Sequence, residues 1–189
     1  MKSDHKRLII GISGASGIKY AISLLETLKT MDIETHLVMS KAAVVTAGLE
    51  CDKKISDIHK LADVVYKSDD IGASIASGSF KTMGMLVVPC SVKTMSEINT
   101  GVTSTLLTRA ADVTLKQRRN LVLMVRESPL HLGHLRTMTS LSEMGAIISP
   151  PVPALYCNPQ SIDEMIDQTI GRLLDLFDIE TSNLQRWKS

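Results

Sequence analysis

The fold class follows from one stretch near the N-terminus, which reads Leu8-Ile9-Ile10-Gly11-Ile12-Ser13-Gly14-Ala15-Ser16-Gly17. Its first half, residues 8–12, is a short and continuous apolar run, which is typical of a strand buried on both faces of a parallel sheet. Beyond it, residues 18–28 carry apolar side chains at helical spacing. A strand, a glycine turn and a helix in this order predict the start of a βαβ unit.

The remaining chain continues this alternation of strands and helices. Apolar runs predict further strands at residues 33–39, 85–88, 121–125 and 146–148, the second of them closed by Pro89. Helical spacing predicts helices at residues 41–49, with Ser40 as the N-cap, and at 106–118, 132–144 and 162–177, followed by a polar tail at 178–189. There is no repeat and no linker-like composition, so residues 1–189 are expected to form a single-domain, doubly wound, Rossmann-like (flavodoxin-like) parallel sheet flanked by helices.

The composition argues against several classes of function. The 21 Lys and Arg residues nearly balance the 20 Asp and Glu residues, so a formal net charge of +1 gives no reason to expect nucleic acid or an anionic membrane as partner. No apolar run approaches the roughly 20 residues that span a bilayer, and no signal peptide is expected. The three cysteines form no Cys-x-x-Cys pair, which argues against a disulfide framework or zinc ribbon and favours a cytoplasmic location.

In a doubly wound sheet, ligands bind where strands end, and the first such place is the glycine turn of residues 13–17. Its backbone N–H groups and the dipole of the following helix favour an anion. The turn is not the dinucleotide fingerprint, and Ser40-Lys41 stands where that fingerprint wants an acid, so a mononucleotide phosphate is favoured over NAD. A turn needed only for packing is the alternative. A serine hydrolase elbow is disfavoured because its final glycine is missing.

Small hydroxyl residues cluster again in Ala76-Ser77-Gly78-Ser79 and in Pro89-Cys90-Ser91-Val92-Lys93-Thr94. Both clusters are expected where a strand ends and a helix begins, and they suit a second phosphate contact or a contact to a ring edge. Lys93 lies near Cys90 and would lower the pKa of a thiol. The favoured interpretation of Cys90 is nevertheless a small buried hydrophobic residue.

A third cluster, Arg126-Glu127-Ser128-Pro129, follows directly after the predicted strand at 121–125. A carboxylate beside an arginine at the end of a strand suits acid/base chemistry, and a surface ion pair is the alternative. His131 and His134 have the spacing of a metal-binding pair but lack a third ligand, so no metal site is expected.

Several cations have no nearby acid to neutralise them, and Arg109 and Lys116 lie seven residues apart on one face of a predicted helix. Arg172 is on the last predicted helix. The tail carries Arg186 beside Trp187, which is the only tryptophan and is best explained if the tail docks against something.

Taken together, these segments resemble the UbiX-type flavin prenyltransferases, a family that includes the B-type components of phenolic acid decarboxylases. The resemblance covers nearly the whole chain and rests on the order and spacing of its motifs. These are Ser-Gly-Ala-Ser-Gly (13–17), Ser40-Lys41, Ala-Ser-Gly-Ser (76–79), Pro-Cys-Ser (89–91), Arg-Ala-Ala-Asp-Val (109–113) with Leu115-Lys116, Arg126-Glu127-Ser128-Pro129, and Arg186-Trp187.

The resemblance implies that reduced FMN receives a dimethylallyl group from dimethylallyl monophosphate, across flavin N5 and C6. The prenylated FMN would then serve a partner decarboxylase of the UbiD type. The family implies a homo-oligomer, typically a dodecamer built from trimers, with sites at subunit contacts and with the tail at 178–189 docking near an active site. No metal is implied, so Lys, Arg and Tyr side chains would stabilise the departing phosphate.

The same resemblance implies roles for individual residues. The implied FMN contacts are Gly14, Ala15, Ser16, Ser40, Ser91, Thr94 and Arg126. The implied contacts to the prenyl phosphate are Ser77, Arg109, Lys116, Tyr156, Arg172, Arg186 and Trp187. Glu127, Lys116 and Tyr156 are implied to be catalytic, with Glu127 exchanging protons with the phosphate and the flavin.

The chain departs from the family pattern in three places. The usual His-Leu-Glu-Asn-Met is His134-Leu135-Arg136-Thr137-Met138, residues 71–75 contain no aromatic, and Leu155 stands where an aromatic often precedes the tyrosine. These changes leave the implied catalytic set intact and leave the shape of the prenyl pocket open. Two alternatives remain, namely an FMN-dependent cysteine-type decarboxylase of the same fold and a non-catalytic flavin-binding subunit. The pathway that uses the product is also open.

Overall fold

A computed structural model of the chain describes residues 6–182 and 184–188. The predicted first strand, β1 (Arg7–Ile12), lies near the centre of one six-stranded parallel sheet with the order β3-β2-β1-β4-β5-β6. Ile10 pairs with Leu37 on one side and with Leu86 on the other. This is the doubly wound order of the predicted Rossmann-like class, and it reverses between β1 and β4.

The elements alternate along the chain as predicted. The other strands are β2 (Glu34–Met39), β3 (Val64–Tyr66), β4 (Gly84–Cys90), β5 (Asn120–Val125) and β6 (Ile147–Ile148). The α-helices are α1 (Ile18–Leu28), α2 (Lys41–Glu50), α3 (Ile55–His59), α4 (Val92–Thr100), α5 (Leu106–Lys116), α6 (Leu132–Glu143) and α7 (Ile162–Asp175). Two short 3₁₀ helices, η1 (Ser74–Ala76) and η2 (Leu155–Cys157), complete the described elements.

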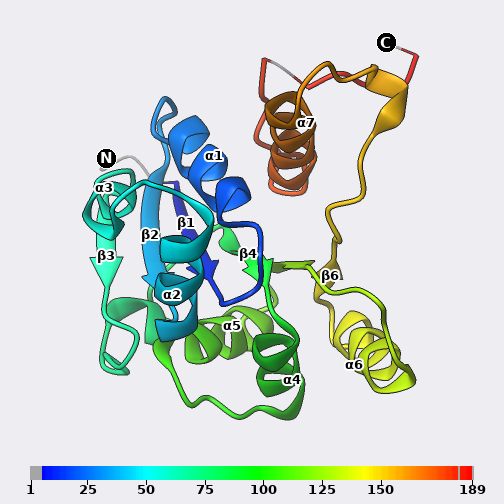
Figure 1. The fold of residues 1–189 in the computed structure, drawn as a ribbon. Coiled ribbons are helices and arrows are strands. Elements are labelled where there is room, and N and C mark those ends of the chain that lie inside the picture. The colour runs from blue at the N-terminus through cyan, green and yellow to red at the C-terminus, as the bar shows by residue number, and fades with distance from the viewer. Residues whose placement is uncertain (1–5, 183, 189) are drawn as a thin grey trace.

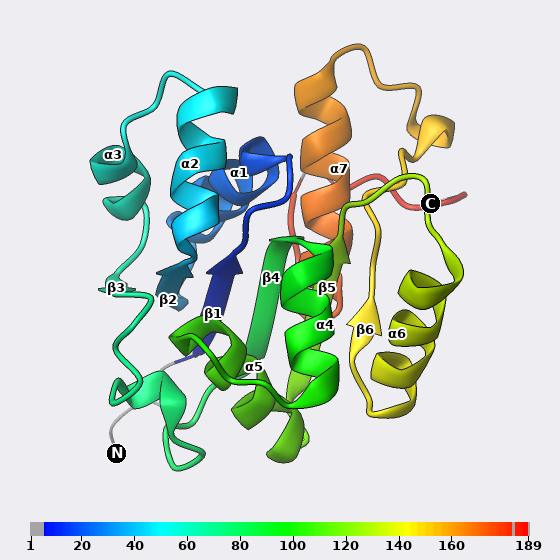
Figure 2. The same ribbon diagram turned by 60° about the horizontal axis from the view of Figure 1, so that its bottom comes forward.

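Two hydrophobic cores cover the two faces of the sheet, because successive side chains of a strand point to opposite faces. Leu8, Ile10 and Ile12 of β1 pack with α1, α2, α3 and α7, whereas Ile9 packs with α4, α5 and α6. Figure 2 shows α4 and α5 crossing in front of β4 and β5, and Figure 1 shows α1 beside α7. No helix in the described ranges is both long and apolar enough to cross a bilayer.

Strand β4 is longer than predicted, since Pro89 does not end it. The strand continues to Cys90, and its pairing with β5 shifts register between Val87 and Cys90. Proline is tolerated in a sheet at such an irregularity, where its missing N–H is not needed by the neighbouring strand. The Pro89 carbonyl still accepts a hydrogen bond, from the backbone N–H of Ser13 at 3.2 Å.

Two predicted helices end earlier than expected. Helix α5 stops at Lys116, two residues short, because Arg118 adopts a left-handed conformation with φ of 56°. Helix α7 stops at Asp175, and Asp178 turns the chain with the same φ. After β6, residues 149–161 leave the sheet and run to the start of α7, where the C-terminal residues lie beside them (Figure 1).

Candidate active site

The carboxyl ends of β1 and β4 are tied together by Ser13, which is 1% exposed. Its hydroxyl donates to the Pro89 carbonyl at 2.8 Å and accepts from the Ser91 backbone N–H at 2.7 Å. The sheet order reverses between these two strands, and a crevice for a ligand is expected at such a switch point. Ser13 therefore holds the ends of these two strands together at the switch point.

The glycine turn does not offer its helix N-terminus to an external anion, as the sequence had suggested. The Glu50 carboxylate, at the end of α2, accepts from the backbone N–H groups of Gly17 at 2.8 Å and Ile18 at 3.1 Å. Burial by itself raises the pKa of the Glu50 carboxyl, but hydrogen bonds from Ser16, Gly17 and Ile18 and the charge of Arg126 outweigh it, and the pKa lies below its ordinary value. The chain's own carboxylate thus caps α1.

Gly14 is required because the turn lies directly against α2. A Cβ atom at this position would stand 2.5 Å from the Cβ of Ala42, closer than real Cβ atoms approach. The Gly14 carbonyl also accepts from the Thr46 hydroxyl at 3.1 Å. Gly14, Ala15 and Ser16 are therefore held in a turn that is half-buried between α1 and α2.

The anion site that α1 cannot supply is available at the N-termini of α2 and α4. Ser40 caps α2 by accepting from the Ala43 N–H at 3.0 Å, and Ser91 caps α4 by accepting from the Thr94 N–H at 3.3 Å. Both caps line one hollow of about 250 Å³. The hollow is lined by Gly14, Ser40, Lys41, Ala42, Ser68, Asp69, Ser91, Lys93, Thr94, Glu97, Ser104 and Thr105. Two helix dipoles, hydroxyl donors and Lys41 fit the phosphate of a mononucleotide there. Lys93 is paired with Glu97 at 3.5 Å, and Asp69 is the other carboxylate of the lining.

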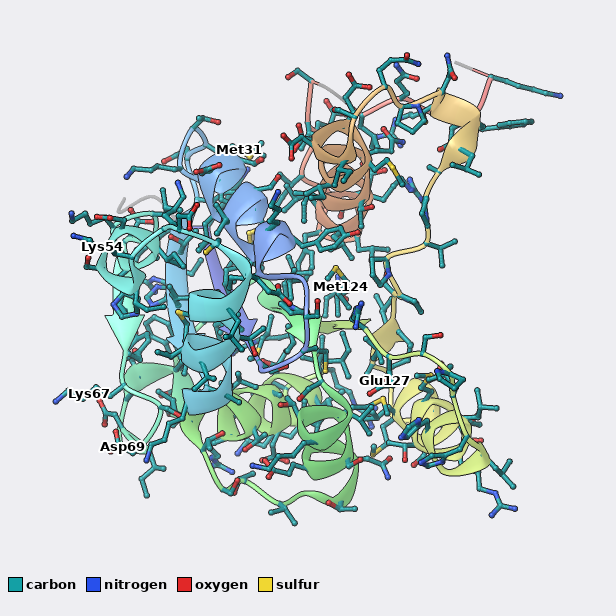
Figure 3. The ribbon with its side chains drawn as sticks, in the orientation of Figure 1. Met31, Lys54, Lys67, Asp69, Met124 and Glu127 are labelled. Atoms are coloured by element: carbon teal, nitrogen blue, oxygen red, sulfur yellow. The ribbon has the colours of Figure 1, made fainter. Side chains whose placement is uncertain are left out.

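Arg126 and Glu127 follow β5 at the same edge of the sheet, and both side chains are exposed in the single chain. The Arg126 N–H donates to the Cys90 carbonyl at 3.1 Å, which fixes the segment beside the end of β4. Burial raises the pKa of Tyr20 in α1, and the positive charge of Arg126 partly opposes this rise. The same charge lowers the pKa of Glu50. Arg126 is thus near enough to Tyr20 and Glu50 for its charge to act on both, and Figure 3 places Glu127 where the chain leaves β5 toward α6.

Two other candidates have structural roles. Cys90 is fully buried, and burial raises the pKa of its thiol to about 12, so the interpretation as a small hydrophobic residue is confirmed. His131 caps α6, since its Nδ1 accepts from the backbone N–H of Gly133 at 3.0 Å and of His134 at 3.4 Å. The imidazole rings of His131 and His134 stack with centroids 3.5 Å apart.

A second group of predicted residues gathers on α7, η2 and the C-terminal residues. Asp175 forms ion pairs with Arg172 at 2.6 Å and with Arg186 at 2.8 Å. The Tyr156 and Trp187 rings meet edge to face, with centroids 5.3 Å apart. Four of the residues implied for the prenyl phosphate are therefore neighbours.

The third group, Ser77, Arg109 and Lys116, belongs to the other side of the sheet. Ser77 follows η1 and precedes β4, so the expectation that its cluster directly follows a strand is wrong. It lies by the end of α5, because a Cβ on Gly78 would meet the Gln117 side chain at 2.5 Å. Lys116 comes just before β5 and Glu127 just after it, and a six-residue strand separates them by roughly 20 Å.

One chain therefore brings Ser40, Ser91 and Thr94 together around the hollow, places Arg126 and Glu127 at the same carboxyl edge of the sheet, and keeps Lys116 at the opposite edge. The Glu50 carboxylate was missed by the sequence analysis. The sequence could have indicated its role, because an acid in the last turn of a helix is unfavourable with the helix dipole and suggests an interaction outside that helix.

Comparisons with known proteins show the family and the fold of the chain. Residues 1–182 match the Flavoprotein family. The chain is 59% identical to the flavin prenyltransferase UbiX of Escherichia coli K12 over 175 residues, which cover 92% of this chain and 93% of the relative. The crystal structure of AnUbiX (PadA1) in complex with FMN and dimethylallyl pyrophosphate matches with a TM-score of 0.96 and 46% identity, over 98% of both chains. A dodecameric FMN-dependent UbiX-like decarboxylase from Escherichia coli O157:H7 matches with a TM-score of 0.95 and 44% identity, over 97% of this chain and 100% of the other.

Proposed function

The chain belongs to the flavoprotein family and, within it, to the UbiX-type flavin prenyltransferases, and we propose that it transfers a dimethylallyl group from dimethylallyl monophosphate to reduced FMN. The flavin supplies its nucleophilic N5 and C6 atoms when it is bound. The product, prenylated FMN, goes to a decarboxylase of the UbiD type. The reaction takes place in the cytoplasm.

One structural observation supports this proposal. The N-termini of α2 and α4 open into a single hydroxyl-lined hollow, whereas Glu50 closes the N-terminus of α1. This arrangement supports one phosphate group between Ser40, Ser91 and Thr94 and disfavours a dinucleotide along the glycine turn. The rest of the flavin would then reach the turn at Gly14, Ala15 and Ser16, with Arg126 beside it.

Glu127 is the proton-handling group of this proposal. It is the first carboxylate after β5 and is exposed toward solvent in the single chain, where its Oε1 accepts from the Ser128 N–H at 3.0 Å. A carboxylate next to Arg126 can pass the proton that N5 loses, as N5 replaces the phosphate on the prenyl group, to that phosphate, and can move the proton released at C6 to the prenyl alkene carbon that gains one as the second bond forms. Lys116 and the arginines would balance the charge of that phosphate without a metal ion, and the Tyr156 hydroxyl would donate a hydrogen bond to it.

The separation of Lys116 from Glu127 supports a site built from more than one copy of the chain. A solved relative is dodecameric, and we infer the same homo-oligomer for this protein. Ser77, Arg109 and Lys116 of one copy would then complete the site that Glu127 begins in another. The tail at 178–189 would dock near such a site, although residues 183 and 189 lie outside the described residues.

Anaerobic incubation of the purified protein with reduced FMN and dimethylallyl monophosphate tests the proposal. Mass analysis of the extracted flavin should show a gain of one C5H8 unit. Glu127→Gln should retain FMN and lose most of this product, while Glu143→Gln, at an exposed glutamate in the last turn of α6, should prenylate normally. Bound but unmodified FMN from the unaltered chain would instead support a decarboxylase or a carrier subunit.

A further inference from the structure

The C-terminal arm, residues 178–188 without 183, lies along α7 of its own chain. Besides the backbone bonds that end the helix, Gln168, Gly171 and Asp175 of α7 lie against residues 181–186 of the arm, and we call these three the α7 track. Their spacing of three and then four residues places them on one face of the helix. Each contributes a different kind of contact.

Gln168 pairs with the backbone of one arm residue at two points. Its Nε2 donates to the Gln185 carbonyl at 2.7 Å, and its Oε1 accepts from the Gln185 N–H at 3.0 Å. The side chain is 7% exposed, so its amide is satisfied mainly through this pairing. A buried amide with both halves bonded to one residue's backbone fixes the position of that residue along the helix.

Gly171 provides the space in which the arm lies. A Cβ on Gly171 would stand 2.9 Å from the Thr181 Oγ1, 3.1 Å from the Leu184 Cδ1 and 3.2 Å from the Leu184 Cβ. The last contact involves an atom next to the backbone, so the arm itself would have to move to make room. Glycine in the middle of a helix is otherwise unfavourable, which points to a packing role here.

Asp175 holds the end of the arm by its charge. Its Oδ1 accepts from Arg186 Nη2 at 2.8 Å, and its Oδ2 accepts from Arg186 Nη1 at 2.9 Å. Oδ2 also accepts from Arg172 Nη1 at 2.6 Å. A bidentate arginine–carboxylate pair fixes orientation as well as distance.

The docked arm in turn contacts Tyr156 in η2. The Tyr156 hydroxyl lies 3.5 Å from the same Gln185 carbonyl that Gln168 holds, and the Trp187 ring meets the Tyr156 ring edge to face at 88°. We propose that Gln168 is a positioning residue, which docks the arm in cis and thereby places Tyr156, Arg186 and Trp187 for the prenyl phosphate. This inference rests on the function proposed above.

Trp187 is the only tryptophan, so its fluorescence anisotropy reports the mobility of the arm directly. Gln168→Leu keeps the bulk of the side chain and removes both hydrogen bonds, which should lower the ratio of docked to released arm roughly 30-fold. The KM for dimethylallyl monophosphate should rise as the inverse of the fraction of the arm that remains docked, while kcat at saturation and the dissociation constant of FMN stay unchanged.

Gly171→Ala should act in the same direction by steric displacement. Its matched control is Gly48→Ala, because Gly48 is also helical but has nothing within 4 Å of an added Cβ. Both substitutions favour the helix, so neither is expected to prevent folding.

The outcomes separate the docking of the arm by Gln168 from its effect on substrate binding. Lower anisotropy with a raised KM in Gln168→Leu and Gly171→Ala, but not in Gly48→Ala, supports the proposal. Unchanged anisotropy overturns the docking role, and lower anisotropy with an unchanged KM overturns the positioning role. If the unaltered chain makes no prenylated flavin, the proposed function fails, and the anisotropy alone then decides whether Gln168 docks the arm.

Discussion

Neutralising Glu50 should destabilise the protein in a manner that depends on pH. The carboxylate accepts from the N–H groups of Gly17 at 2.8 Å and Ile18 at 3.1 Å, at the positive end of α1. Gln retains acceptor geometry but loses the charge. A charge-assisted hydrogen bond exceeds a neutral one by about 1 kcal/mol, and the interaction with the helix dipole adds up to about 1 kcal/mol. We therefore expect Glu50→Gln to cost about 2 kcal/mol at pH 7.

The pH dependence has a defined sign. The folded pKa of Glu50 is lowered, whereas the unfolded chain has an ordinary glutamate pKa of about 4.3. The contribution of the charge is therefore complete above about pH 5 and is lost as the pH falls through the folded pKa. Below about pH 4 the difference between Glu50→Gln and the unaltered protein should shrink.

Thermal unfolding followed by circular dichroism measures this difference. In a chain of this length, about 2 kcal/mol corresponds to a decrease in Tm of roughly 4–8 °C at pH 7. All samples need one protein concentration, because the Tm of an oligomer depends on it. Glu143→Gln, in the last turn of α6, controls for the loss of one carboxylate. Equal Tm values at pH 7, or a difference that persists at low pH, would refute the assignment of Glu50 as the charged cap of α1.

Three further results are expected. Because burial raises the pKa of the Cys90 thiol to about 12, iodoacetamide at pH 8 should alkylate the partly exposed Cys51 and leave Cys90 unmodified until urea unfolds the chain, as peptide mass mapping will show. Ser13→Ala leaves the backbone N–H of Ser91 without its acceptor and should lower the free energy of unfolding in urea by about 2 kcal/mol. An unchanged urea midpoint would contradict the role of Ser13 in joining β1 to β4. Glu127→Gln and Lys116→Met should each be nearly inactive alone but regain about a quarter of the activity when co-refolded in equal amounts, whereas a site within one chain predicts an inactive mixture.

Local sequence pattern was sufficient for elements with strong periodicity. Helix α1 begins and ends where predicted, since Gly17 adopts a φ of 117° before it and its apolar residues repeat at helical spacing. A helix was expected to begin at the cluster of residues 89–94, as α4 does, but its end was not predicted, because residues 92–100 are rich in Thr, Ser and Asn and carry few apolar side chains. Strand β3 has only three residues, too few for a pattern, and it forms because it pairs with β2.

For the site, the sequence was informative where topology brings residues together. Parallel strands share one carboxyl edge, so Ser40, Ser91 and Arg126 could be expected near each other from their place after a strand. Ser77 was misplaced because a hydroxyl-rich loop has the same composition whether it follows a strand or precedes one. Glu50 was missed because its partners lie 32 and 33 residues away, a distance that no local pattern spans.

The contact between Gly14 and Ala42 constrains how this protein can change in evolution. With 2.5 Å between a Cβ at position 14 and the Cβ of Ala42, position 14 has no room for a side chain while Ala42 remains. A larger residue at 14 would require glycine at 42, and that second glycine would weaken α2 by about 1 kcal/mol in addition to Gly48. Position 14 should therefore stay glycine in descendants of this chain wherever position 42 carries a side chain, even where the surrounding surface diverges.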